Sequence, residues 1–184
     1  MTVSILDFTM TAGPHPAVSD VSRVALEAAV SDTDASLAIS AAWHVAEGFT
    51  GRTYREVSSA TLIVSAGGPG VVRWPRYPWP DAVEAEWHDG QAWVPGRSLI
   101  VGGLCEIEHA GKWKLTASDV PAAPIGDHVT QGVVQVALYN LIWAPQRREF
   151  SHQSAGDTSL TREAQKGILY GSGAGALLAS EVVL

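Results

Sequence analysis

The chain has 184 residues, of which 46% are hydrophobic and 17% charged, a composition typical of one globular domain or of one domain with an extension. A net charge of −7 with only 12 Lys and Arg residues argues against wrapping nucleic acid, which requires clustered cations to displace counterions from phosphates. The single cysteine, Cys105, excludes an intramolecular disulfide and every metal site built from several cysteines.

The first 19 residues are predicted to be a loose N-terminal arm. We find no hydrophobic period in residues 1–15, which lead into Gly13-Pro14-His15-Pro16. Residues 1–10 contain no Lys or Arg and no long apolar run, so we expect neither a signal peptide nor a transmembrane segment. The protein is therefore expected to be made in the cytoplasm.

Two helices are predicted next. Asp20 is a suitable cap for a short helix that ends near Val30, and residues 31–34 (Ser-Asp-Thr-Asp) break it and provide new caps. In the second helix apolar residues recur every four positions, namely Leu37, Ala41, Val45 and Phe49, with Ala38, Ala42 and Ala46 beside them. Gly48 and Gly51 provide its C-terminal stop.

A small antiparallel β insertion is predicted at about residues 58–116. Short strands are expected at residues 61–64, 71–72, 98–101 and 104–108. The proline-rich residues 74–80 are expected to be an extended crossing, because proline has no N–H to donate to a sheet. The clearest hairpin pairs residues 82–87 with 91–94, since Asp89-Gly90 accepts the positive φ of a tight turn.

A long helix is predicted from Pro124 to Trp143, where Pro145 stops it. From Val133 onward it is apolar almost all round, unlike a helix on the surface of a small isolated domain. Its apolar stretch is much shorter than the roughly 20 residues of a membrane span. Two partners are therefore expected to cover it, one from its own domain and one from a neighbouring subunit.

Residues 146–184 are predicted to form an extended C-terminal arm. They contain no core-forming period up to Thr161, then a flexible glycine-rich stretch at residues 171–175 and an apolar end. Such an end usually docks on another surface. The predicted fold is thus α+β, with a mainly helical connector core at residues 20–145, the small β insertion and this arm.

Sites for catalysis, metal or cofactor binding are not expected. The six histidines lack the i,i+4 spacing and the cysteine neighbours of metal sites, and there is no Gly-x-Ser-x-Gly motif. The glycine-rich residues 66–70 precede no Lys-Ser/Thr and no helix, so a turn is favoured over a phosphate site. Four carboxylates are interpreted as the solvated face of the β insertion rather than as a glycosidase pair: Glu84, Glu86, Glu106 and Glu108.

The seven tryptophans leave a second interpretation open. A carbohydrate- or ligand-binding β module is an alternative, because exposed aromatic rings form stacking platforms for sugars. The platform would consist of Trp74, Tyr77, Trp79, Trp87 and Trp93. Aromatic residues are equally enriched at protein interfaces, and an uncharacterised hydrolase is a more distant third possibility.

The order of several motifs resembles the head–tail connector (adaptor) family of long-tailed phages. The likeness extends from about Asp20 to Thr161 and includes prophage-derived gene transfer agents, whose adaptors this acidic, alanine-rich chain is similar to. The motifs are residues 47–52 (Glu-Gly-Phe-Thr-Gly-Arg), 74–83 (Trp-Pro-Arg-Tyr-Pro-Trp-Pro-Asp-Ala-Val), 88–90, 110–113, 119–123 (Asp-Val-Pro-Ala-Ala) and 155–159 (Ala-Gly-Asp-Thr-Ser).

The resemblance implies a non-enzymatic structural protein without cofactors, located at the head–tail junction of a particle assembled in the bacterial cytoplasm. It would form a ring of about twelve copies under the portal protein and receive the next tail component, a stopper or connector. DNA would pass through the channel without specific binding. The residues expected to bind the portal are Arg147, Arg148, Phe150, Leu160, Ile168, Leu169, Tyr170, Leu177, Leu178, Val182, Val183 and Leu184. Those expected to pack between subunits are Val133, Val134, Leu138, Leu141, Ile142 and Trp143.

Overall fold

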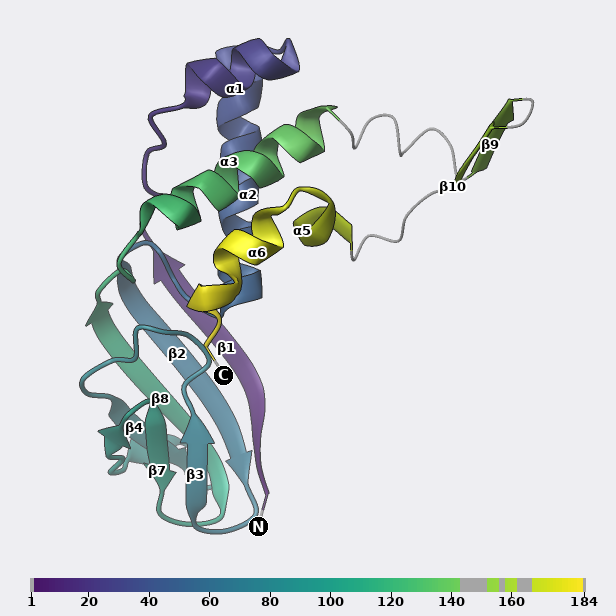
Figure 1. Cartoon of the computed structure of the whole chain (residues 1–184). Coiled ribbons are helices and arrows are strands. Elements are labelled where there is room, and N and C mark those ends of the chain that lie inside the picture. Colours follow the sequence, from purple (N-terminus) through teal and green to yellow (C-terminus); the bar gives the residue numbers. More distant parts are fainter. Residues whose placement is uncertain (1, 143–151, 156–157, 162–166, 184) are drawn as a thin grey trace. The chain divides into compact units, whose positions relative to one another are not determined.

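The computed structural model describes residues 2–142, 152–155, 158–161 and 167–183 (Figure 1). The chain divides into two units that alternate along the sequence. The sheet unit comprises Met1–Pro14 and Gly51–Pro124, and the helical unit comprises His15–Thr50 and Ile125–Leu184. Among the described helices, none is both long enough and apolar enough to cross a lipid bilayer.

The sheet unit contains two antiparallel sheets that share one core. The larger sheet has the strand order β1-β2-β8-β4-β5, and the smaller one has the order β3-β7-β6. The strands are β1 (Val3–Ala12), β2 (Val57–Ala66), β3 (Gly70–Arg73), β4 (Glu84–His88), β5 (Trp93–Pro95), β6 (Ile100–Val101), β7 (Leu104–Ile107) and β8 (Gly111–Val120). Leu62 and Trp113 of the larger sheet and Ile107 of the smaller one lie in this core.

Alternation of buried and exposed side chains explains how β2 and β8 form the centre of the larger sheet. Successive side chains of a strand point to opposite faces, so a period of two buries one face. Along β8, Trp113, Leu115 and Ala117 are buried, and Trp113 and Leu115 lie opposite Val64 and Leu62 of β2. The core therefore follows from the sequence pattern of these two strands.

The hairpin formed by β4 and β5 confirms the prediction made from Asp89-Gly90. Trp87 lies opposite Val94. The Asp89 carboxylate accepts hydrogen bonds of 2.8 Å from the backbone N–H groups of Gln91 and Ala92, and these bonds lower its pKa. Gly90 has φ +107°, a conformation that favours glycine.

The helical unit is built around α3. Its elements are α1 (Val21–Ala28), α2 (Asp32–Thr50), α3 (Asp127–Ile142), the hairpin strands β9 (His152–Ala155) and β10 (Thr158–Thr161), the short helices α5 (Ile168–Gly171) and α6 (Ala174–Leu178), and the 3-10 turn η2 (Ala179–Glu181). α3 contacts α1, α2, α5 and α6. Ser31 caps α2 as expected, since its Oγ accepts the N–H of Asp34 at 3.1 Å.

The prediction of a mainly helical core with a small β insertion is wrong. Strand and helix occur in about equal amounts, and the sheet unit includes residues outside the predicted insertion. Residues 3–12, in which we found no period, form β1 at one edge of the larger sheet. The physical reason is a register shift between Ile5 and Asp7, which interrupts the alternation that would otherwise reveal the strand.

The apolar side of α2 predicted from a four-residue recurrence matches the buried face only in part. Ala42 and Ala46 are buried as predicted, but Leu37 is 66% exposed. Ile39 and Trp43, which the recurrence did not include, are buried. α2 contains five alanines, so two neighbouring stripes of the helix satisfy the same spacing. Packing of the bulky Trp43 decides between them.

Candidate functional site

The C-terminal segment of the chain docks on α3. The chain leaves α3 at Ile142, and residues 167–183, here called the docked tail, return to the same helix (Figure 1). Both short helices of the docked tail, α5 and α6, contact α3. The structure therefore shows that the apolar C-terminal segment, which was predicted to dock on some surface, packs against a helix of its own chain.

The side chain of Leu178 in α6 packs against Gly132 of α3. Leu178 is fully buried, and a Cβ atom added to Gly132 would lie only 3.2 Å from its Cγ. Glycine in a helix interior costs about 1 kcal/mol relative to alanine, so Gly132 is unfavourable for the helix itself. Its absent side chain makes room for Leu178.

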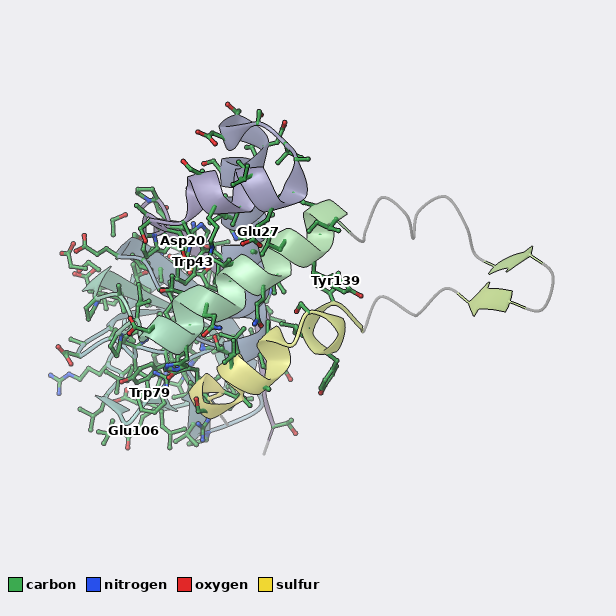
Figure 2. All side chains as sticks on the ribbon, turned by 45° about the horizontal axis from the view of Figure 1, so that its top comes forward. Asp20, Glu27, Trp43, Trp79, Glu106 and Tyr139 are labelled. Carbon is green, nitrogen blue, oxygen red and sulfur yellow. The ribbon has the colours of Figure 1, made fainter. Side chains whose placement is uncertain are left out.

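A second close approach fixes α5 against α3. A Cβ atom on Gly171 would lie 2.5 Å from the hydroxyl oxygen of Tyr139. Tyr139 is buried and projects from α3 toward the docked tail, as Figure 2 shows. Two glycines, Gly132 on α3 and Gly171 on the tail, thus define how the tail fits.

Polar contacts complete the docking. His128 Nε2 lies 2.8 Å from Glu181 Oε1, and the N–H of Val183 donates to the carbonyl of Thr50 at 2.9 Å. Thr50 ends α2, where a carbonyl has no partner within its helix. A solvent-accessible ion pair contributes about 0.2–1 kcal/mol, and full burial of a leucine about 1.5–3 kcal/mol. Leu178 is therefore the main anchor.

The residues predicted to bind the portal fall into three groups. Arg147, Arg148, Phe150 and Leu184 lie outside the described residues, and Leu160 lies in β10. Ile168, Leu169, Leu177, Val182 and Val183 are half-buried in the docked tail, Leu178 is fully buried there, and Tyr170 is 78% exposed. Binding of the portal by this arm stays a prediction, and Leu178 is accessible to another protein only if the tail detaches.

The residues predicted to pack between subunits also differ in exposure. Val133 and Val134 are buried within the chain. Leu138, Leu141 and Ile142 are half-buried, and Trp143 lies outside the described residues. The docked tail is a cover for α3 that sequence reasoning did not identify. Packing of α3 against a neighbouring subunit stays a prediction, now carried by the three half-buried residues.

An exposed aliphatic patch lies on the outer face of the smaller sheet. It consists of Val71, Leu99, Val101 and Leu104, all at least 40% exposed. Their neighbours Val72 and Cys105 point into the core, and burial raises the pKa of the Cys105 thiol to about 11. Cys105 is therefore a core residue, not a nucleophile at neutral pH.

The proposed aromatic platform does not form a continuous surface. Trp74 is buried in the core. Trp79 meets Tyr77 edge-on at an interplanar angle of 90°, and Trp93 meets His88 at 88°. A sugar stacks on rings that present their faces together, so this arrangement argues against the alternative of a carbohydrate-binding module.

The four glutamates considered for catalysis line one open groove of about 770 Å³, together with Arg97. Glu84, Glu106 and Glu108 are exposed, and Glu86 pairs with Lys114. Three exposed carboxylates and one ion-paired glutamate are what a solvated face predicts. Elsewhere in the described chain, metal-ligating side chains meet at His15, His44 and Glu47, which sequence spacing did not reveal.

Comparison with known proteins shows that this chain is similar in fold to a solved structure. No protein-family model matches the sequence, and the search of curated proteins gives no match. Among solved structures, the chain is similar to one described as the neck of an empty GTA (gene transfer agent) particle computed with C6 symmetry. The TM-score is 0.53 at 12% sequence identity, and the match covers 97% of this chain and 96% of the other. The two chains share a fold over nearly their whole length.

Proposed function

We propose that the protein is a head–tail connector of a phage-like or gene transfer agent particle, with a structural and not an enzymatic role. The observation that carries this proposal is the fold likeness to a chain from a particle neck over 97% of the sequence. The motifs at residues 47–52, 74–83 and 119–123, which resemble phage adaptors, support the same assignment independently.

In the proposed assembly about twelve copies form a ring below the portal protein and above the next tail component. The C6 symmetry belongs to the neck structure that this chain resembles, and a twelve-fold ring is compatible with it because twelve is a multiple of six. The half-buried Leu138, Leu141 and Ile142 and the aliphatic patch offer apolar area for contacts between components.

The arm between α3 and the docked tail is the proposed portal-binding element. It contains the antiparallel hairpin β9–β10, in which Thr158 lies opposite Ala155 and Thr161 opposite His152. Its two ends are anchored, one by α3 and the other by the docked tail. Anchoring at both ends reduces the conformational entropy that the arm loses on binding.

Replacing residues 146–166 by a Gly/Ser linker of equal length tests this proposal. We expect the variant to fold, because Leu178 and the rest of the docked tail remain, and to lose attachment to the portal protein of the same particle. Co-purification with the portal and electron microscopy of the complex measure the result. Truncation after Phe150 is a poorer test, because it also removes Leu178 from α3.

The matched control replaces Gly102, in the exposed turn between β6 and β7, by asparagine, which tolerates its φ of +57°. This control should attach like the wild type. A linker variant that attaches normally would disprove the role of the arm. Absence of the wild-type protein from purified particles, measured by mass spectrometry, would disprove the connector function itself.

DNA is expected to pass the proposed ring without binding to it. The net charge of −7 and the four glutamates of the groove disfavour contact with phosphates through like-charge repulsion. We expect no mobility shift of duplex DNA by the purified protein at low ionic strength. Tight binding that weakens steeply with added salt would contradict this expectation.

A further inference from the structure

Two histidines and a buried glutamate converge in the helical unit. His15, His44 and Glu47 place their potential ligand atoms within 4.8 Å of one another, and we call them the His–Glu cluster. His44 and Glu47 lie about one turn apart on α2, whereas His15 comes from the segment that precedes α1. The fold thus brings together residues that are 29 positions apart in the sequence.

We propose that the His–Glu cluster binds a divalent transition metal ion, with zinc as the best fit. Two imidazoles and one carboxylate form a recognised zinc ligand set that leaves a fourth position for water. His15 Nε2 lies 3.4 Å from Glu47 Oε2. Ligands about 2.0–2.1 Å from a tetrahedral ion are about 3.3–3.4 Å apart, so these two atoms already have the required spacing.

The third ligand needs only a side-chain adjustment. The rings of His15 and His44 are in contact, with centroids 4.5 Å apart and an interplanar angle of 88°. His44 is exposed, so its side chain is free to change rotamer and gives the ion a route of entry from solvent. An ion pair between His15 and Glu47 alone does not account for the presence of His44.

Burial makes a divalent cation favourable at this position. The side chains of His15 and Glu47 are only 8% and 3% exposed. A carboxylate taken out of water is costly unless it is paired or coordinates a metal. His15 is also held in place, because Pro14 and Pro16 restrict the backbone on either side and its ring stacks on Trp43 at an interplanar angle of 7°.

A bound ion would cross-link two segments of the helical unit. It would join the segment at His15, where the chain enters this unit, to the last two turns of α2. Binding to the folded state alone raises stability by mass action. The inferred role is structural and holds whether or not the connector function is correct.

Titration of the metal-free, full-length protein tests the proposal. After treatment with a chelator, we expect zinc to bind with one equivalent per chain by calorimetry and to raise the thermal midpoint by at least about 5 °C at saturation. Cobalt should give the visible absorption of a tetrahedral site. No binding of either ion at millimolar concentration would overturn the proposal.

Substitution of the exposed ligand distinguishes the cluster from other histidines. His44→Gln should fold normally and bind zinc at least about tenfold more weakly. His88→Gln, which changes a histidine of the β4–β5 hairpin, is the matched control and should bind like the wild type. Equal zinc affinity of His44→Gln and the wild type would show that the ion binds elsewhere, and circular dichroism without metal confirms that both variants fold.

Discussion

Trp113→Ala should lower the free energy of unfolding of the sheet unit by about 3–5 kcal/mol, the range for removing a large aromatic residue from a core. Trp113 is fully buried in β8, between Val64 of β2 and Trp87 of β4. Its indole N–H also donates to the carbonyl of His109 at 3.1 Å. The substitution therefore removes apolar contacts and leaves the His109 carbonyl without this donor.

Urea unfolding followed by far-UV circular dichroism measures this effect without relying on the fluorescence of the lost tryptophan. Trp93→Ala is the matched control, because Trp93 is half-exposed on the edge strand β5. Its ring lies 5.5 Å from Lys114 Nζ, and such a contact at an exposed site contributes about 0.5–1 kcal/mol. Equal destabilisation by both substitutions would contradict the packing described for Trp113.

Gly96→Ala provides a second test of the same packing. A Cβ atom at this position would lie 2.7 Å from the Trp113 ring. The ring is enclosed by β2 and β4, so it has little room to shift, and we expect destabilisation of about 1–3 kcal/mol from overpacking. The control is Gly48→Ala, because a Cβ atom added at Gly48 would have no other atom within 4 Å. Gly90 is unsuitable as a control because its φ is positive, a conformation that alanine does not adopt readily.

Local signals in the sequence predict the elements that depend on local chemistry. The Asp89-Gly90 turn predicted the β4–β5 hairpin, and Ser31 predicted the start of α2. β1 depends instead on pairing with β2, about 50 residues away, and its register shift hides its period. β8 was missed although Trp113, Leu115 and Ala117 alternate with two lysines and a threonine, which is the pattern of a half-buried strand, so the sequence did contain the signal for it.

The candidate site depends on the three-dimensional fit of side chains, which the sequence pattern does not reveal. Hydrophobicity predicted that the C-terminal end docks and that α3 needs a cover. Only the three-dimensional structure shows that each is the partner of the other, through the fit of Leu178 at Gly132. The His–Glu cluster was missed for a related reason, since His15 and His44 are distant in sequence and only the path of the chain before α1 brings them together.

Leu178→Ala should release the docked tail. Deleting a buried leucine side chain costs about 2–5 kcal/mol, and each 1.4 kcal/mol is a factor of ten in an equilibrium. The amide of Val183, which donates to Thr50, should therefore exchange with solvent at least about tenfold faster if exchange requires release of the tail. Hydrogen-exchange mass spectrometry of residues 167–183 measures this change.

Leu177→Ala is the matched control, because Leu177 is half-buried on the same short helix. It should change the hydrogen-exchange rate of the tail much less than Leu178→Ala does. An unchanged exchange rate in Leu178→Ala would show that other contacts hold the tail.

Release of the docked tail also connects stability to the proposed function. A detached tail frees one end of the portal-binding arm, so the arm loses more conformational entropy on binding. Leu178→Ala should therefore weaken portal attachment even though Leu178 is buried in the folded chain.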